Sequence, residues 1–134
     1  MRTIYTAGVW DLFHAGHLNL LWESKQLGDV LIVGVVSDLG CYRYKGVSPR
    51  ENSQVRRHRI ERLGFVDVVV DQQGTDPTEH LERFRPAAMT HGDDWEQLRE
   101  GHETLARLGI DFIRIPYTQG MSSTLLRERM RVQA

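Results

Sequence analysis

The chain has 134 residues, with 17 lysines and arginines against 18 aspartates and glutamates, for a net charge of −1. This length predicts one domain with a sizeable core, and the charge balance argues against broad electrostatic binding to nucleic acid or to an anionic membrane. Cys41 is the only cysteine, which excludes an intramolecular disulfide and a multi-cysteine metal site. No apolar run approaches the ~20 residues of a membrane span, and no signal peptide precedes the first strand-like segment, so we expect a soluble cytoplasmic protein.

Short apolar runs rich in β-branched residues predict strands that are buried on both faces, as in a parallel sheet. Segments with helical spacing separate them. The first contains Leu18, Leu21 and Trp22 on one face and ends before Gly28. A capping box at residues 76–79, with proline at the first helical position, begins the next. The five predicted strands span residues 4–7, 30–36, 66–70, 87–90 and 110–115.

Two more helices are predicted, over residues 95–108 and 122–131, whereas residues 38–52 predict a long irregular loop. A loop of that length within a compact domain is usually functional or disordered. Strands that alternate with helices predict right-handed crossovers. The sequence therefore predicts an α/β fold over residues 1–134, a single-domain Rossmann-like doubly wound five-stranded parallel sheet with helices on both faces.

The segment that follows the first predicted strand, residues 8–17, reads G-V-W-D-L-F-H-A-G-H. Gly8 permits close approach of the backbone to a ligand, and the helix N-terminus that follows favours anions. His14 and His17 lie three residues apart where the helix begins, so both rings can face one bound phosphate. A metal pair is disfavoured because no third ligand is supplied nearby. The placement favours a phosphate site over a helix cap with a surface histidine.

This segment resembles the H-x-G-H motif of the nucleotidyltransferase superfamily, and its full form is close to the cytidylyltransferase branch. Residues 118–124, T-Q-G-M-S-S-T, are similar to the second motif of that family, R-T-E-G-I-S-T-[ST]. Within that branch the chain resembles bacterial glycerol-3-phosphate cytidylyltransferases. Further matches follow in order along the chain: K-Q-L-G-D at 25–29, V-S-D at 36–38, K-G at 45–46, Arg56, F-V-D at 65–67 and H-G-D-D-W at 91–95.

The resemblance implies transfer of CMP from CTP to a small, glycerol 3-phosphate-like phosphomonoester, with release of pyrophosphate and formation of a CDP-alcohol. It implies that His14, His17 and Lys45 are catalytic and that Mg²⁺ arrives with the nucleotide, without a metal site of the protein's own. It also implies a homodimer.

Further site residues follow from the same resemblance. Asp11 and Asp38 would contact the acceptor, although either could instead cap a helix. Asp93 and Asp94 could likewise cap the helix that follows them while one of them meets the nucleotide. The nucleotide-binding residues implied are Gly8, Val9, Gly16, Arg56, Gly92, Asp93, Asp94, Thr118, Gly120, Ser122, Ser123, Thr124 and Arg127.

The chain departs from the second motif at two positions, where Tyr117 replaces the usual arginine and Gln119 the usual glutamate. A tyrosine cannot supply the bidentate cation that holds a triphosphate, and Arg127 is the candidate to replace it. Residues 122–127 also resemble the S-S-T-x-x-R ending of related adenylyltransferases. Two alternatives therefore stay open: an adenylyltransferase that uses ATP with a phosphorylated acceptor, and a nucleotide-binding regulator without turnover.

Overall fold

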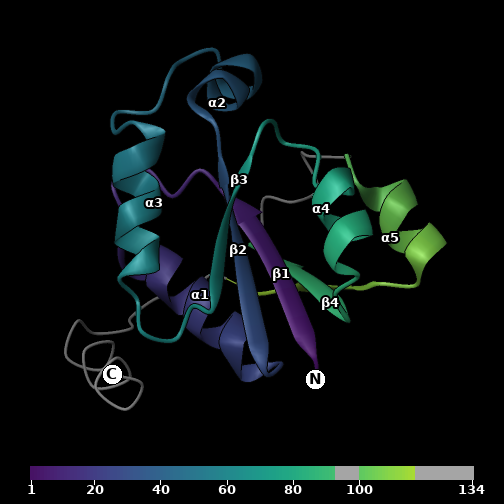
Figure 1. Ribbon diagram of the computed structural model, residues 1–134. Helices are drawn as coiled ribbons and strands as arrows, with labels where there is room; N and C mark the ends of the chain where they lie inside the picture. The colour runs from purple at the N-terminus through teal and green to yellow at the C-terminus, as the bar shows by residue number, and fades with distance from the viewer. Residues whose placement is uncertain (93–99, 117–134) are drawn as a thin grey trace.

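The computed structural model describes residues 1–92 and 100–116, in which strands and helices alternate along the chain (Figure 1). The strands are β1 (Thr3–Gly8), β2 (Val30–Val36), β3 (Val68–Gln72), β4 (Ala88–His91) and β5 (Asp111–Arg114). The helices are α1 (Ala15–Gln26), α2 (Asp38–Lys45), α3 (Ser53–Glu61), α4 (Thr78–Phe84) and α5 (His102–Leu108).

The five strands form one parallel sheet in the order β3-β2-β1-β4-β5. In register, Tyr5 lies opposite Ile32 on one side and Met89 on the other. The chain proceeds outward from β1 to β3 and then returns to place β4 beside β1, so the strand order reverses between β1 and β4. Ligands of open α/β sheets bind outside the carboxyl ends of the strands at such a reversal. The predicted fold class is confirmed.

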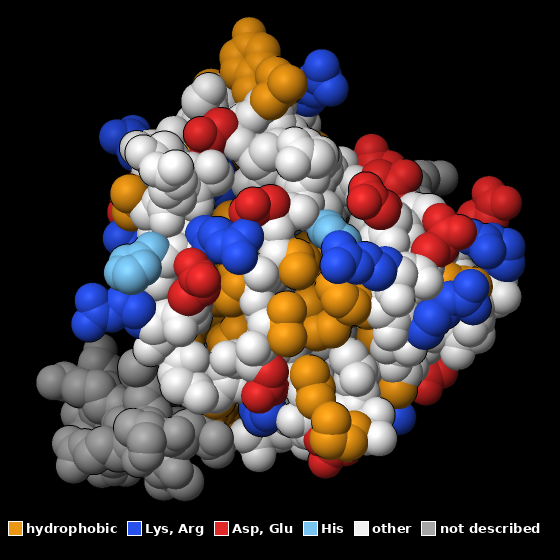
Figure 2. Space-filling view, viewed as in Figure 1, with side chains coloured by type: hydrophobic (Ala, Val, Ile, Leu, Met, Phe, Trp, Pro, Cys, Tyr) orange, Lys and Arg blue, Asp and Glu red, His pale blue; other side chains and the backbone are white. Residues whose placement is uncertain are grey.

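Helices cover both faces of the sheet. Ile4 contributes to a core with residues of α1 and α3, whereas Tyr5, the next residue, packs toward α4 and α5. This alternation follows from the period of two along a strand, and it explains why the strands are apolar throughout. In Figure 2, apolar side chains gather between α3 and α4, where β3 forms the sheet edge and Val68 is 39% exposed.

The prediction for residues 38–52 was wrong over its first half, because α2 occupies Asp38–Lys45. The side chain of Ser37 accepts a hydrogen bond from the N–H of Gly40 at the start of this helix, and Gly46, with φ of 78°, ends it. Both are ordinary helix-end signals, but the helix is too short for an apolar repeat to reveal it. The consequence is that Lys45 is presented by a helix end rather than by an irregular loop.

The other boundaries differ by smaller amounts. The strand predicted from residue 66 begins at Val68, because the carboxylate of Asp67 accepts the N–H of Leu31 (2.8 Å) in place of a ladder bond. Helix α4 begins at Thr78, whose N–H donates to the Asp76 carboxylate (2.9 Å). The helix predicted over residues 122–131 lies outside the described residues. Among the described helices, none is both long enough and apolar enough to cross a membrane.

Candidate active site

The β1–α1 loop adopts an unusual backbone conformation before the two histidines. Trp10 and Leu12 have φ values of 58° and 48°, in the left-handed region that bulky residues rarely adopt. The indole N–H of Trp10 donates to the carbonyl oxygen of Gly34 (2.9 Å), and the residue is only 3% exposed. A Cβ on Gly8 would lie 2.9 Å from the Trp10 ring. Gly8 is therefore needed to seat Trp10 under the loop.

The side chains of His14 and His17 both accept backbone N–H groups at the start of α1. The Nδ1 atom of His14 accepts the N–H of Gly16 (3.0 Å), and Nδ1 of His17 accepts the N–H of His14 (3.3 Å). A ring nitrogen that accepts a hydrogen bond carries no proton, so each neutral imidazole holds its proton on Nε2. The two rings stack with centroids 3.8 Å apart. Together they offer a pair of Nε2–H donors at a helix N-terminus.

The environment keeps His17 neutral. Burial is the largest cause that lowers the pKa of His17 from 6.5 to about 4, and the positive charge of Lys45 adds to it. At neutral pH the ring is therefore a hydrogen-bond donor through Nε2 without a net charge. Lys45 lines the same cavity as the two histidines.

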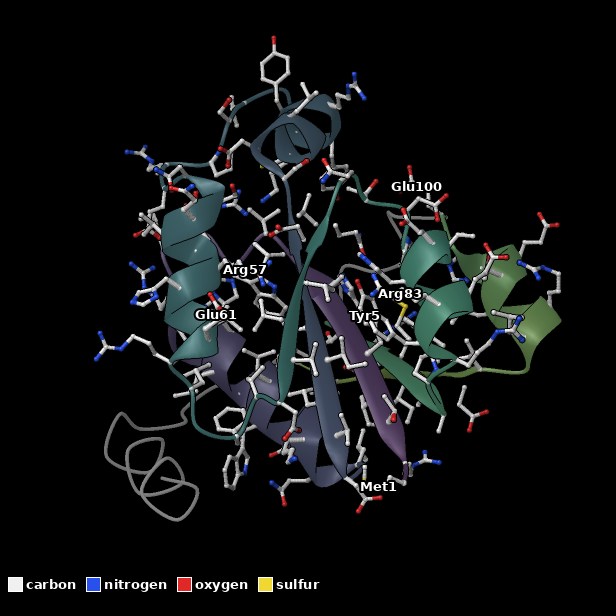
Figure 3. All side chains as sticks on the ribbon, viewed as in Figure 1. Met1, Tyr5, Arg57, Glu61, Arg83 and Glu100 are labelled. Carbon is white, nitrogen blue, oxygen red and sulfur yellow. The ribbon has the colours of Figure 1, made fainter. Side chains whose placement is uncertain are left out.

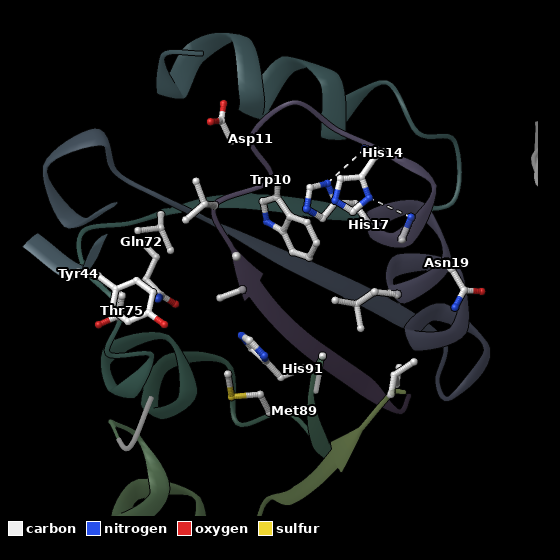
Figure 4. Close-up of a pocket in the computed structure, with 18 of the residues that line it drawn as sticks. Trp10, Asp11, His14, His17, Asn19, Tyr44, Gln72, Thr75, Met89 and His91 are labelled. Carbon is white, nitrogen blue, oxygen red and sulfur yellow. Dashed lines mark hydrogen bonds between the residues drawn. The ribbon is translucent and has the colours of Figure 1, made fainter. Parts of the chain in front are cut away.

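The histidines lie at one side of a cavity of about 610 Å³ at the carboxyl ends of the strands (Figure 4). This is within the ordinary range for small-molecule sites. Tyr44, Gln72 and Thr75 lie at the opposite side in the same view. The predicted site residues that line the cavity are Gly8, Val9, Asp11, His14, Gly16, His17, Lys45 and Gly92.

Two of the residues predicted to contact ligands do not line this cavity. Arg56 is fully buried, and its Nη2 atom pairs with the carboxylate of Asp38 (2.5 Å). The same guanidinium donates to the carbonyl oxygens of Val9, Val36 and Glu51, at 2.7, 2.7 and 2.9 Å. Arg56 thus links the carboxyl ends of β1 and β2 to the loop before α3. In this structure it holds the backbone next to the cavity and does not line the cavity itself.

Asp11 is also engaged by the protein itself. Its carboxylate accepts the N–H groups of Arg50 (2.8 Å) and Glu51 (3.0 Å), although the residue lines the cavity. The remaining predicted contacts lie outside the described residues: Asp93, Asp94, Thr118, Gly120, Ser122, Ser123, Thr124 and Arg127.

Several cavity residues were not foreseen from the sequence. Gln72 is the clearest case, because its amide oxygen accepts the hydroxyl of buried Tyr5 (2.7 Å) and its amide nitrogen donates to Gly74 (2.8 Å). Figure 3 shows Tyr5 between β1 and α4, where it also meets His80 Nδ1 at 3.0 Å. The third strand was predicted to end at residue 70, so Gln72 was counted as a loop residue, whereas it is the last residue of β3. His91, the last residue of β4, lines the cavity as well.

The lowered pKa of His17 predicts a pH-dependent stability. Between about pH 6.5 and 4 the unfolded chain takes up a proton at this residue that the folded chain does not, so this contribution is fully present above pH 6.5 and is lost as the pH falls toward 4. We expect the melting temperature of a His17→Gln variant to fall less than that of the wild type between pH 7.5 and 4.5, measured by calorimetry without phosphate. His58→Gln, on the exposed side of α3, is the control and should keep the wild-type slope. Identical slopes for all three proteins would contradict the assigned environment of His17.

Among residues 1–92 and 100–116, no group of three or more His, Cys, Asp or Glu side chains could hold a metal ion. The donor set of the cavity is instead made of imidazole N–H groups, a lysine and a helix N-terminus. Such donors bind anionic oxygens.

Comparison with known proteins gives the family. Residues 5–129 match the family described as cytidylyltransferase-like. The chain is 33% identical over 132 residues to the bifunctional protein HldE of Campylobacter curvus, and 36% identical over 132 residues to that of Nitratiruptor sp.. These alignments cover 97% of the chain but only 27% and 28% of the relatives, so the chain spans just over a quarter of their length.

A solved structure supports the same assignment. The lipopolysaccharide core biosynthesis protein of Thermoplasma volcanium superposes with a TM-score of 0.76 at 27% identity, covering 89% of this chain and 99% of that one. The sequence match, the shared fold and the H-x-G-H pair at the strand-order reversal agree. The chain belongs to the cytidylyltransferase-like family of nucleotidyltransferase enzymes.

Proposed function

We propose that the chain transfers a nucleotidyl group from a nucleoside triphosphate to a small phosphomonoester. A phosphate oxygen of the acceptor attacks the α-phosphorus, the bond from that phosphorus to the bridging oxygen breaks, and pyrophosphate leaves. The observation that carries this proposal is the pair of Nε2–H donors that His14 and His17 present at the N-terminus of α1. These donors suit the negative charge that develops on the transferred group.

The other roles follow from charge. A phosphomonoester is already a nucleophile, so the reaction needs alignment and charge neutralisation rather than a general base. Lys45, at the exposed end of α2, lines the cavity and can bind a phosphate there through its ammonium group. Mg²⁺ would enter as part of the nucleotide substrate, bound to its triphosphate.

We propose CTP as the first donor to test, because the H-G-D-D-W and T-Q-G-M-S-S-T segments resemble cytidylyltransferases. The second candidate is ATP, which the S-S-T-x-x-R pattern of residues 122–127 favours. The acceptor in the first case is a glycerol 3-phosphate-like compound. The name of the Thermoplasma relative supports sugar phosphates as a second acceptor class.

The opposite side of the cavity suits such an acceptor. Tyr44 offers an aromatic ring and a hydroxyl that can bind the hydroxyl groups of a polyol or sugar phosphate. Gln72 and Thr75 line the same side, where the protein already bonds the Gln72 amide at both ends and the Thr75 hydroxyl donates to Glu100. This side of the cavity is proposed in addition to Asp11 and Asp38, which stay predicted acceptor contacts and whose carboxylates also accept hydrogen bonds from the protein.

Pyrophosphate release tests the proposed function. CTP and ATP are each combined with glycerol 3-phosphate and with a panel of sugar phosphates in the presence of Mg²⁺, and products are identified by mass spectrometry. We expect release with one nucleotide and one acceptor class, abolished in a His14→Ala/His17→Ala double variant. Tight nucleotide binding with no release from any pair would overturn transfer and support the regulator alternative.

Arg127 provides a further prediction about the triphosphate. If Tyr117 leaves the triphosphate without its usual cation, Arg127 is expected to supply it, at a cost of about 2 kcal/mol or roughly 30-fold in kcat/KM on mutation to alanine. Arg129→Ala and Arg131→Ala are matched controls from the same segment and should stay near wild type. Equal behaviour of all three variants in steady-state assays would exclude compensation by Arg127.

The proposed homodimer is tested by light scattering at micromolar concentration. We expect twice the mass of the 15.5 kDa chain, because a small domain gains stability by burying more apolar surface in a symmetric contact. A monomer would refute the dimer and leave the proposed chemistry unaffected.

A further inference from the structure

The strained loop that carries the histidines is bound to the segment before α3 by reciprocal hydrogen bonds. The carboxylate of Glu51 accepts the N–H of Leu12 (2.9 Å), and the carboxylate of Asp11 accepts the N–H groups of Arg50 and Glu51 (2.8 and 3.0 Å). Each segment thus caps the backbone of the other. The two segments are about 40 residues apart in the sequence, so no local signal couples them.

Glu51 is itself held in place from α3. The guanidinium of Arg59 binds both oxygens of the Glu51 carboxylate, at 2.6 Å each. The carbonyl oxygen of Glu51 accepts from Arg56, which also donates to the carbonyl oxygen of Val9 at the other end of the loop. A bidentate pair fixes the orientation of both partners as well as their separation. Glu51 is therefore an immobilised acceptor aimed at Leu12.

The β1–α1 loop needs such a partner. Trp10 and Leu12 both have left-handed backbone conformations, which persist only where the surroundings enforce them. The loop conformation also sets the packing of the catalytic rings: Trp10 meets His17 edge to face with centroids 5.5 Å apart, and Phe13 lies 5.4 Å from the same ring. A loop that relaxed at Leu12 would change the position of His14 two residues later.

We propose that Glu51 is a positioning residue for nucleotidyl transfer, which, with Arg59 behind it, holds Leu12 in the conformation that aims His14 and His17 into the cavity. This inference rests on the proposed function for its effect on rate. Its structural part, the protection of the Leu12 N–H, does not depend on that function.

The chain supplies a matched control on α3, the helix that carries Arg59. Glu61, the last residue of α3, pairs with Arg57 (3.5 Å), and Figure 3 labels both. Both glutamates make an ion pair with an arginine of α3, but only Glu51 accepts an N–H of the histidine loop. A general effect of removing an ion pair from α3 should therefore appear in both variants, whereas positioning should appear in Glu51 variants alone.

The first readout is amide hydrogen exchange at Leu12 by nuclear magnetic resonance, which requires no substrate. Glu51→Ala should accelerate this exchange on the order of tenfold or more, since the amide loses a charged acceptor. Glu51→Gln keeps one acceptor oxygen for the amide but loses the bidentate pair with Arg59, so it should retain part of the protection. Glu61→Ala should leave the Leu12 exchange rate unchanged.

The second readout is the split between kcat and KM, measured well below every melting temperature. Glu51→Ala should lower kcat by about 10- to 100-fold, the size of effect expected when catalytic groups shift slightly, with a much smaller change in the KM of the nucleotide. Arg59→Ala should give a smaller loss of kcat than Glu51→Ala. Glu51→Gln, which keeps the acceptor for Leu12 but not the bidentate pair, should also lose less than Glu51→Ala, and Glu61→Ala should match the wild type.

Unchanged Leu12 exchange in Glu51→Ala, or a loss of kcat that Glu61→Ala shares, would overturn the inference. If Glu51→Ala does not fold, Arg59→Ala carries the comparison, and wild-type kcat together with wild-type Leu12 exchange in that variant would overturn the inference. If the wild-type protein releases no pyrophosphate from any substrate pair, the proposed function fails while the exchange data still decide whether Glu51 holds the loop.

Discussion

His14→Ala and His17→Ala are each expected to lower turnover by roughly 10²-fold or more. The reason is geometric: each ring has its Nδ1 atom occupied by a backbone N–H, so each presents Nε2–H into the cavity as a fixed donor. Removing one preorganised donor to charge that develops in the transition state has an effect of this size. The measurement is kcat with the substrate pair identified by the pyrophosphate assay.

Capping must be separated from catalysis in this test, because His14 also accepts the N–H of Gly16 at the start of α1. His14→Asn is the informative variant, since asparagine restores a cap acceptor while it lacks the imidazole donor. We expect it to keep most of the melting temperature and to lose turnover as His14→Ala does. Near-wild-type turnover in His14→Asn and His17→Ala would remove both histidines from the proposed mechanism.

The sheet could be predicted because its signal is local. Strands such as Val30–Val36 are apolar at almost every position, which occurs when both faces are covered. The edge strand β3 was predicted two residues too early. At Asp67 the carboxylate takes the place of a ladder bond by accepting the N–H of Leu31, and this depends on a partner in β2 that the local sequence does not reveal. Helix α2 was missed because its short length leaves only its two end signals.

The site was predictable to the extent that it follows a motif. The H-x-G-H segment and Lys45 line one cavity, and their catalytic roles stay a prediction. Gln72 enters the same cavity through a hydrogen bond to Tyr5, 67 residues away, and no spacing rule connects the two. The bonds that engage Asp11 and Asp38 are of the same kind, made to residues brought near by the fold. Side-chain type alone therefore could not tell a ligand contact from an internal one.

For Arg56, the family resemblance and the structure predict different effects of mutation. The resemblance implies a contact to the nucleotide, whereas the structure shows a fully buried guanidinium that serves three carbonyl oxygens and Asp38. Arg56→Ala would leave these acceptors without their donor inside the protein. Truncating one partner of such a buried, charged network costs about 3 kcal/mol or more.

We therefore expect Arg56→Ala to lower the melting temperature by about 10 °C or more, as scaled for a domain of this size, and to reduce turnover because the carboxyl ends of β1 and β2 lose their common anchor. Arg56→Lys keeps the charge but cannot bind several carbonyl oxygens in a fixed fork, so it should also be destabilised. Arg57, the next residue, is half-buried, pairs with Glu61 of α3 and Asp71 of β3, and donates to the carbonyl oxygen of Val69 (3.1 Å). Arg57→Ala should thus lower the melting temperature far less. A wild-type melting temperature in Arg56→Ala, together with a raised KM for the nucleotide, would show instead that Arg56 turns toward the ligand and that its internal bonds contribute little.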